Sequence, residues 1–310
     1  MSSIVTLQFL IDGLLMGGLI GLGAIGVTLT YSILRFANFA HGEFIAWGAY
    51  ATLAVAGVIG WMGGQHLGAL GGPLGPFSVG WPILAAGLVA MVLTGLLALG
   101  LDVVLFRLLR ARGNAIIMVM ASFGASMALR SLLEFVFTSE PRYFSRDIQI
   151  AIPLGFGVRV TPDQMLMLGL TAALVVTVHL VMTRTTIGRS MQAVSENPEL
   201  ARVTGVNVEA VIRATWVAGG ALACAAGIMS GITVQVRPFM GFDLLLPLFA
   251  AAILGGIGSV PGAVIGGLIV GLSEAAAVPL VGGGFRAAVA FLLLIAVLLV
   301  KPTGLFGARE

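Results

Sequence analysis

The sequence predicts an all-α, polytopic membrane protein with about eight hydrophobic segments, some of them broken or re-entrant. Of its 310 residues, 59% are hydrophobic and only 9% are charged. The mean hydropathy of +1.09 is far above what a water-soluble domain of this size needs for its core. Long apolar runs recur along the whole chain, with glycine-rich or polar breaks between them. We therefore expect residues 1–310 to form a single transmembrane domain.

The apolar runs are long enough for membrane-spanning helices, which need about 20 residues to cross roughly 30 Å of hydrocarbon. They are continuous, whereas the strands of a membrane barrel alternate apolar and polar residues. The runs cover residues 7–34, 44–59, 81–106, 115–137, 165–182, 211–232, 244–278 and 285–300. The run 244–278 is too long for one span, and the segment GGIGSVPG at 255–262 breaks it. A hairpin of two helices is therefore expected there.

The distribution of basic residues predicts the orientation of the chain in the membrane. With the N-terminus outside, most of the 16 Lys and Arg residues lie in cytoplasmic loops, as the positive-inside rule favours. The cytoplasmic set is Arg35, Arg107, Arg110, Arg112, Arg184, Arg189, Arg202, Arg213, Lys301 and Arg309. The outer set is Arg142, Arg146, Arg159, Arg237 and Arg286, while Arg130 is intramembrane. The C-terminus is then cytoplasmic if the run 244–278 enters and leaves from the same face.

Several classes of function are disfavoured by the residues present. The net charge of +3 does not indicate nucleic acid, because the basic residues are scattered at the ends of apolar runs. The first basic residue is Arg35, so a cleaved signal peptide is not expected. The single lysine, Lys301, does not belong to a phosphate-binding loop ending in Lys-Ser/Thr. The histidines His41, His66 and His179 lack a metal-ligand spacing. From all these residues together, we expect no metal, no cofactor and no catalytic centre.

Some polar residues within the apolar runs have both a structural and a functional interpretation. Ser126 and His179 could serve an intramembrane protease, but small residues at a helix contact explain Ser126 more simply. Arg130 and Glu134 are spaced i, i+4, which favours an ion pair on one helix face. Four acidic residues near the ends of runs are expected to reach interfacial water: Asp12, Asp102, Asp243 and Glu274. Close helix packing is predicted by the Gly-x-x-x-Gly spacings that begin at Gly13, Gly17, Gly227, Gly262 and Gly267.

A polar break separates the first two apolar runs. Asn38, His41 and Glu43 place an amide, an imidazole and a carboxylate within one short segment. In structural terms the segment would be a capped turn between helices at the inner surface. In functional terms it would be a broken helix lining the translocation pathway, where freed backbone groups meet a polar solute.

The longest cytoplasmic loop on this topology, residues 184–213, contains the signature of a short helix. Asn197 is a good N-cap, Pro198 suits the first helical position, Glu199 complements the positive helix end, and Gly205 is a good stop. The helix either lies on the membrane surface or docks onto a soluble partner. Its apolar positions and the charges around them are Leu200, Val203, Glu196, Glu199 and Arg202.

Four segments of the chain form one ordered set of motifs. They are YSILRFANFAHGE at 31–43; GRSMQA at 188–193 with ENPELA at 196–201 and GVN at 205–207; AILGGIGSVPGA at 252–263; and KPTG at 301–304. Together they closely resemble the branched-chain amino acid permeases of bacterial ABC importers, specifically the LivH-type subunit. The resemblance runs essentially from end to end.

The resemblance implies a non-enzymatic permease domain in the bacterial inner membrane. Its partners would be two cytoplasmic ATPase subunits, a second permease subunit and a periplasmic substrate-binding protein. The second permease would be a different chain, as is usual in the family, or another copy of this one. ATPase coupling would belong to Glu196, Asn197, Pro198, Glu199, Leu200, Ala201, Arg202, Val203 and Gly205. The outer loop 139–164 would offer the binding protein Arg142, Tyr143, Arg146 and Phe156.

The expected substrate is a branched-chain, hydrophobic amino acid. The translocation pathway is expected at the two broken segments, with Asn38, Phe39, His41, Glu43, Gly255, Gly256 and Gly258. Related permeases carry urea, short amides or other amino acids, and these substrates stay open. A secondary transporter with a proton or sodium site inside the bundle is the alternative from a different class.

Overall fold

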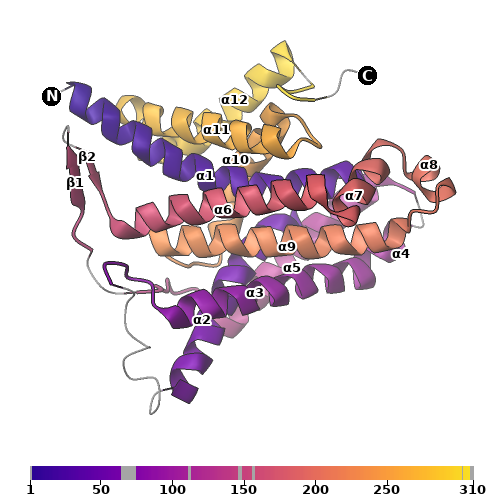
Figure 1. Ribbon diagram of the computed structural model, residues 1–310, viewed down its shortest axis with the longest axis horizontal. Coiled ribbons are helices and arrows are strands. Elements are labelled where there is room, and N and C mark those ends of the chain that lie inside the picture. Colours follow the sequence, from indigo (N-terminus) through magenta and orange to yellow (C-terminus); the bar gives the residue numbers. More distant parts are fainter. Residues whose placement is uncertain are drawn as a thin grey trace.

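The protein is a bundle of helices in the computed structural model, which describes residues 2–63, 75–110, 113–145, 149–155, 158–301 and 303–307 (Figure 1). Six residues named in the sequence analysis lie outside these ranges: His66, Arg112, Arg146, Phe156, Pro302 and Arg309. The helices are α1 (Ser2–Leu34), α2 (Ala40–Gly63), α3 (Trp81–Leu101), α4 (Arg107–Arg110), α5 (Ala115–Phe137), α6 (Pro162–Arg184), α7 (Thr186–Glu196), α8 (Pro198–Val203), α9 (Val208–Thr233), α10 (Met240–Gly255), α11 (Val260–Val281) and α12 (Arg286–Val300). A π-helical turn, η1 (Asp102–Phe106), joins α3 to α4, and a 3₁₀ turn, η2 (Gly283–Phe285), precedes α12.

The predicted membrane spans are confirmed by length and composition. Within the described residues, 8 helices are long and apolar enough to cross a bilayer. They are Leu7–Leu34, Ala40–Met62, Trp81–Arg110, Ala115–Phe137, Pro162–Arg184, Val208–Thr233, Val260–Leu280 and Gly283–Val300. The helix α10 is shorter, with 16 residues, or about 24 Å at about 1.5 Å per residue. That length is less than the roughly 30 Å of hydrocarbon.

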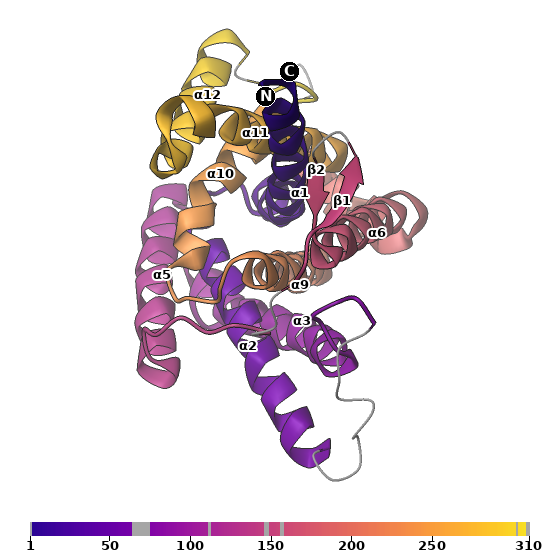
Figure 2. The same cartoon turned by 90° about the vertical axis from the view of Figure 1, so that its left-hand side faces the viewer.

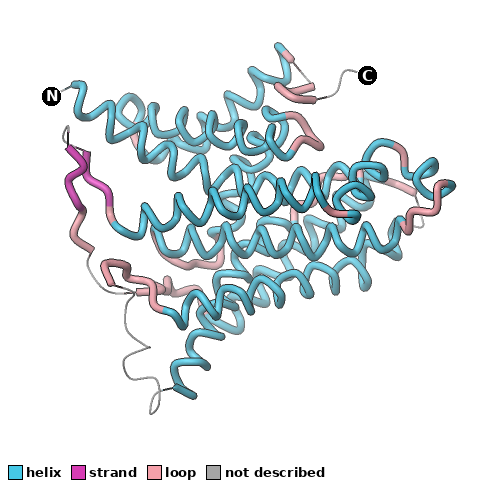
Figure 3. Tube along the Cα trace, in the orientation of Figure 1, coloured by secondary structure: helices cyan, strands magenta, loops and turns pink. Residues whose placement is uncertain are grey.

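The helices differ in how deeply they lie in the bundle. In both α1 and α9, 72% of the most apolar window is buried, compared with 11% in α6 and 6% in the last span. The first two therefore form the centre and the others the edge. Connections collect at the two ends of the bundle: α7 and α8 lie at one end, and the N-terminus and the strands lie at the other (Figures 1 and 3).

Glycines allow the central helices to approach one another closely, as the Gly-x-x-x-Gly spacings predict. A Cβ added to Gly267 would lie 2.3 Å from Gly21 Cα, and one on Gly271 would lie 2.3 Å from the nitrogen of Gly17. The backbones of α1 and α11 are thus in direct contact. A similar crossing brings α2 against α10, where a Cβ on Gly241 would lie 1.8 Å from the carbonyl oxygen of Gly42.

The predicted hairpin in the run 244–278 is confirmed. The helix α10 ends at Gly255, and α11 begins at Val260, with Ser259 Oγ capping it by accepting from the amide of Gly262 at 3.0 Å. The turn between them meets the C-terminal segment, because the amide of Leu305 donates to the carbonyl of Leu254 at 2.8 Å. The motifs at 252–263 and 301–304 therefore belong to one packed unit.

Two loops contain more regular structure than the sequence predicts. The strands β1 (Ile152–Gly155) and β2 (Val158–Val160) form an antiparallel hairpin in the loop 139–164, with Ile152 opposite Val160. The loop 184–213 contains α7 as well as the predicted α8. Most of that loop is therefore helical.

Candidate translocation site and coupling helix

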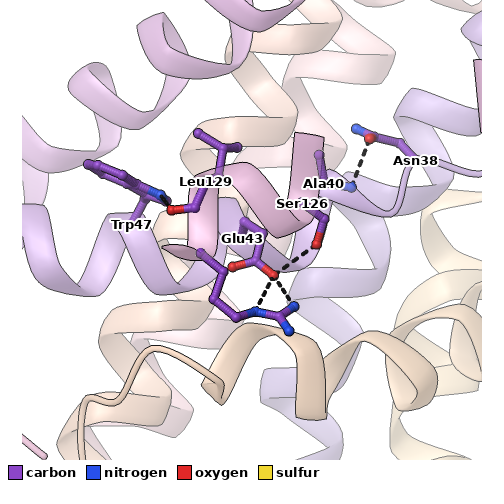
Figure 4. Close-up of polar contacts among 7 residues, drawn as sticks. Asn38, Ala40, Glu43, Trp47, Ser126 and Leu129 are labelled. Carbon is purple, nitrogen blue, oxygen red and sulfur yellow. Dashed lines mark hydrogen bonds and ion pairs between the residues drawn. The ribbon is translucent and has the colours of Figure 1, made fainter. Parts of the chain in front are cut away.

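The break between α1 and α2 is a capped turn that is anchored to α5. Arg35 follows α1 with a left-handed φ of 59°, which ends the helix. Asn38 Oδ1 accepts from the amide of Ala40 at 3.1 Å and so caps α2 (Figure 4). The amide of Phe39 donates to Ser122 Oγ of α5 at 3.1 Å. The capping interpretation of this segment is correct.

The polar side chains of this break lie inside the protein rather than on its surface. Asn38 is 5% exposed, and His41 and Glu43 are each 1% exposed. The imidazole of His41 packs on α1, where a Cβ on Gly26 would lie 2.7 Å from His41 Cε1. Within the described part of the chain, Asn38 Nδ2, His41 Nε2 and Glu43 Oε2 have no hydrogen-bond partner. The segment therefore places unpaired polar groups in the protein interior, where they cost stability and are typically retained for a function.

Glu43 forms the buried charge pair of this site. Its Oε1 accepts from Ser126 Oγ at 2.9 Å (Figure 4), from Arg130 Nε at 3.2 Å and from an Arg130 terminal nitrogen at 2.5 Å. The guanidinium of Arg130 also lies over the rings of Phe239 and Phe242, at 4.7 and 4.6 Å from their centroids. The pair therefore joins α2 and α5 to the start of α10.

This geometry corrects one expectation and argues against one alternative. Arg130 pairs with Glu43 instead of Glu134. The carboxylate of Glu43 is fully buried, and a buried charge without a counter-charge would strongly destabilise the protein. The hydroxyl of Ser126 donates to Glu43, whereas His179 of α6 lines a different cavity with residues of α1 and α7. The protease hypothesis therefore has no geometric support.

Two of the acidic residues that were expected to reach interfacial water are buried. Asp102 is 2% exposed and forms an ion pair with Arg110, and Glu274 is 4% exposed. Asp102 is the first residue of the π-helical turn Asp102–Phe106, and Arg110 lies in α4 directly after this turn. Asp243 is exposed and pairs with Arg237 at 2.8 Å. Sequence spacing alone did not indicate the Asp102–Arg110 pair, because the π turn changes the helical register.

The short helix of the loop 184–213 has the caps that the sequence predicts. Asn197 Oδ1 accepts from the amides of Glu199 and Leu200 at 3.1 and 3.0 Å, and Gly205 ends the turn with a φ of 89°. Leu200 is 61% exposed and Val203 is 85% exposed, while Ala201 faces inward at 3%. Glu196, Pro198, Glu199 and Arg202 are also exposed. The helix thus presents apolar side chains away from the bundle.

The preceding helix, α7, connects this loop to the rest of the protein. It packs tightly on the end of α6, since a Cβ on Gly188 would lie 2.3 Å from the carbonyl oxygen of Val181. Near its other end, the carbonyl of Ser195 accepts from the guanidinium of Arg35. The residue that ends α1 therefore touches the segment that leads into α8.

The predicted pathway glycines lie at the turn between α10 and α11. Gly256 and Gly258 have φ values of 96° and 94°, which favour glycine. Gly255 lies against Gly262, and Gly256 lies against the C-terminal segment. Gly258 and Ser259 line a cavity of about 350 Å³ together with residues of α1, α6 and α7. This places the turn at the same end of the bundle as α7, and the assignment of these glycines to the pathway stays a prediction.

Comparison with known proteins agrees with this architecture. The chain is 32% identical to the high-affinity branched-chain amino acid transport system permease protein LivH of Escherichia coli K12, over 98% of this chain and 96% of that protein. It is 33% identical to BraD, the corresponding permease protein of Pseudomonas aeruginosa, with the same coverage of 98% and 96%. A solved structure, PsaBC from Streptococcus pneumoniae in complex with Fab, has a similar fold, with a TM-score of 0.50, 13% identity, and coverage of 96% of this chain and 93% of that one. Residues 9–299 match the family model described as "Branched-chain amino acid transport system / permease component", and the chain belongs to that family.

Proposed function

We propose that this chain is a transmembrane permease subunit of a bacterial ATP-binding-cassette importer for branched-chain, hydrophobic amino acids. The named function of the LivH and BraD relatives supports the substrate class. The observation that carries the mechanism is the capped helix α8, which exposes Leu200 and Val203 at one end of an apolar bundle. Urea and short amides are the alternative substrates.

The energy for transport comes from two cytoplasmic ATPase subunits in this proposal. The helix α8 enters a groove of an ATPase subunit, where Leu200 and Val203 supply buried apolar area. Glu196, Glu199 and Arg202 set the orientation of the contact through charges at its rim. The whole chain acts as one transmembrane domain, and residues 184–213 form its coupling loop.

Movement of α8 is transmitted to the translocation site through Arg35. Its side chain donates to the carbonyl of Ser195 just before α8, and its backbone lies just before the capped turn at Asn38. A shift of the coupling loop therefore acts on the start of α2, which carries His41 and Glu43. Asn38, Phe39, His41 and Glu43 line the pathway in one of the alternating conformations, and the turn at Gly255, Gly256 and Gly258 moves with them.

Two further partners complete the importer. A second permease subunit, a different chain or a second copy, pairs with this one in the lipid bilayer. A periplasmic binding protein docks on the end of the bundle that contains β1 and β2. In this arrangement the N-terminus is outside and the C-terminus is cytoplasmic.

The proposal is tested by replacing Leu200 with Asp in the complete importer reconstituted in proteoliposomes. The substitution puts an unpaired charge into the groove, and we expect assembly with the ATPase to weaken by about 3–5 kcal/mol. ATP-driven leucine uptake and co-purification of the ATPase should both fall, while the amount of permease in the membrane stays unchanged.

The matched control is Asn207→Asp, which adds the same charge nearby on the exposed N-cap of α9, where Asp caps equally well. It should leave assembly and uptake near normal. If Leu200→Asp assembles, hydrolyses ATP and transports normally, the contact is elsewhere. Uptake that follows a proton or sodium gradient instead of ATP would support a secondary transporter.

A further inference from the structure

The helices α2 and α5 pack along a seam that consists of the Glu43–Arg130 ion pair and two further contacts. Glu43 and Tyr50 are seven residues apart on α2, and so are Arg130 and Phe137 on α5, so each pair lies on one face of its helix. Glu43 contacts Arg130, and the rings of Tyr50 and Phe137 lie 4.9 Å apart. Between these contacts, Trp47 Nε1 donates to the carbonyl of Leu129 at 3.0 Å (Figure 4). The seam therefore continues for about 10 Å from the ion pair to Tyr50.

A cavity of about 410 Å³ opens at the far end of this seam. Its walls include the apolar side chains of Leu53, Val136 and Phe137 and the cation of Arg142. A space of this size is suitable for a small amino acid. In Figure 2, α5 and α10 lie toward the left of the bundle, and α2 runs from near its centre toward the bottom.

The polar groups of the cavity have unused hydrogen-bonding capacity. Tyr50 is 0% exposed, yet its hydroxyl has no hydrogen-bond partner in the described ranges. The side chain of Arg142 is exposed, and its guanidinium makes no hydrogen bond or ion pair with any residue that the structure describes. A buried phenol without a partner and a cation at the same cavity are complementary to a carboxylate.

The backbone around Arg142 is held in place. Its amide donates to the carbonyl of Val236 at 2.9 Å, and the amide of Val236 donates back at 2.8 Å. Tyr143 is fixed by a hydrogen bond from its hydroxyl to Gln235 Oε1 at 3.1 Å. The segment that contains Val236 leads into Phe239, whose ring lies on Arg130. A ligand at Arg142 is thus connected through the chain to the Glu43–Arg130 pair.

We propose that this cavity is a binding site for the free amino acid, in which Arg142 and Tyr50 hold its α-carboxylate and Leu53, Val136 and Phe137 contact its aliphatic side chain. The inference rests on the proposed function, since it names a site for the amino acid that the importer carries. On the proposed orientation, the cavity is the periplasmic mouth of the α2–α5 seam. A ligand with the same side chain but no carboxylate would lose the contact with the cation.

The test measures protection of a cysteine placed in the cavity wall. Ala54 is exposed and lines the cavity, so the complete importer with Ala54→Cys is labelled by a charged thiol reagent in detergent, without the binding protein. Leucine at about ten times its dissociation constant should slow labelling by about tenfold, because few sites remain empty. Leucinamide, which lacks the carboxylate, should not slow it. Arg142→Gln and Tyr50→Phe should each remove most of the protection by leucine.

The controls separate this site from general effects. Val58→Cys lies one turn further along α2, and its side chain is 54% exposed, so its labelling should be insensitive to leucine. The native Cys224 is buried and gives the background. If Ala54→Cys does not assemble, Thr138→Cys reports on the same cavity, because Thr138 is exposed and lines it.

Equal protection by leucine and leucinamide would overturn the proposal. Protection by leucine that appears only after the binding protein is added would overturn it as well, because the protection would then come from docking of that protein over the cavity. ATP-driven leucine uptake by the unsubstituted importer is measured separately. A normal uptake without protection therefore rejects the cavity site and leaves the proposed function intact.

Discussion

At the scale of single residues, the most consequential feature is a charge pair in the interior of a membrane protein. The side chain of Glu43 is 1% exposed and that of Arg130 is 12% exposed, so neither charge is well solvated. Such groups are expensive within a bilayer and are retained where they have a structural or functional role. Here the pair holds together elements that lie 87 residues apart in the sequence.

Replacing Glu43 with Gln should therefore destabilise the protein. The substitution leaves Arg130 buried without a counter-charge, which costs about 3–5 kcal/mol. The apparent melting temperature of the purified complex should fall, and leucine uptake should fall with it. The control Ser126→Ala removes one hydrogen bond to the same carboxylate, worth about 1.5–3 kcal/mol, and should cost less than Glu43→Gln because Arg130 keeps its counter-charge.

A double variant, Glu43→Gln with Arg130→Met, separates the effect of the ion pair on stability from its effect on transport. Methionine is apolar, and its sulfur packs favourably against rings such as those of Phe239 and Phe242. The double variant should be more stable than Glu43→Gln, while uptake stays low because the pathway lacks its charges. Full recovery of uptake would show that the pair is only structural.

The sequence predicted the polar residues between α1 and α2, but it did not predict which cation pairs with Glu43. Asn38, His41 and Glu43 interrupt an apolar run, and a break in the hydrophobic pattern is a local signal. The partner of Glu43 depends on which helices pack together, and the i, i+4 rule pointed Arg130 to Glu134 instead. Tertiary packing and the burial of Glu43 decided the pairing.

At the scale of the helices, local signals predicted the ends of α8, while α7, the π-helical turn and the β hairpin were not predicted. The caps of α8, at Asn197 and Gly205, are local and were recognised correctly. The helix α7 could have been predicted, because Ile187, Met191 and Val194 have the i, i+4, i+7 spacing of an amphipathic helix and Thr185 is a good N-cap. The π-helical turn at Asp102–Phe106 could not, since no residue pattern marks it.

The crossing of α2 and α10 offers a test of the glycine packing. Gly241→Ala places a Cβ that would lie 1.8 Å from the carbonyl oxygen of Gly42, so the backbones must separate. Overpacking of this kind typically costs about 1–3 kcal/mol. The melting temperature of the complex should decrease, and uptake should decrease as well because α10 carries the rings that contact Arg130.

The matched control for this crossing is Gly169→Ala in α6. A Cβ at Gly169 meets nothing within 4 Å, and alanine favours a helix over glycine by about 0.5–1 kcal/mol. This variant should be as stable as the parent or slightly more stable. An unchanged melting temperature for Gly241→Ala would contradict the close contact at the crossing.

At the scale of the whole molecule, the hairpin of α10 and α11 determines at which end of the bundle the C-terminal segment lies. The turn at 255–259 lies beside α7, and the C-terminal segment bonds to Leu254 and Gly255 at the same end. The end of α11 lies beside the start of α1, because a Cβ on Gly13 would lie 2.9 Å from Leu272 Cα. The turn and the end of α11 therefore lie at opposite ends of the bundle, as a hairpin that enters and leaves from one face requires.

This arrangement makes the orientation in the membrane testable with two reporters. The end of the bundle with α7 and α8 carries Arg107, Arg110, Arg184, Arg189, Arg202 and Arg213, and the positive-inside rule assigns such an end to the cytoplasm. A green fluorescent protein fused after Glu310 should therefore fluoresce, and alkaline phosphatase fused there should be inactive.

Alkaline phosphatase inserted at Ile150 tests the opposite end of the bundle. This residue is 85% exposed and precedes β1, so an insertion there should be tolerated and the enzyme should be active in the periplasm. The two fusions must report opposite sides, because the C-terminal segment packs at the end of the bundle that contains α7. Phosphatase activity after Glu310 together with an inactive insertion at Ile150 would reverse the orientation, and the exposed apolar face of α8 would then lie outside, out of reach of any ATPase.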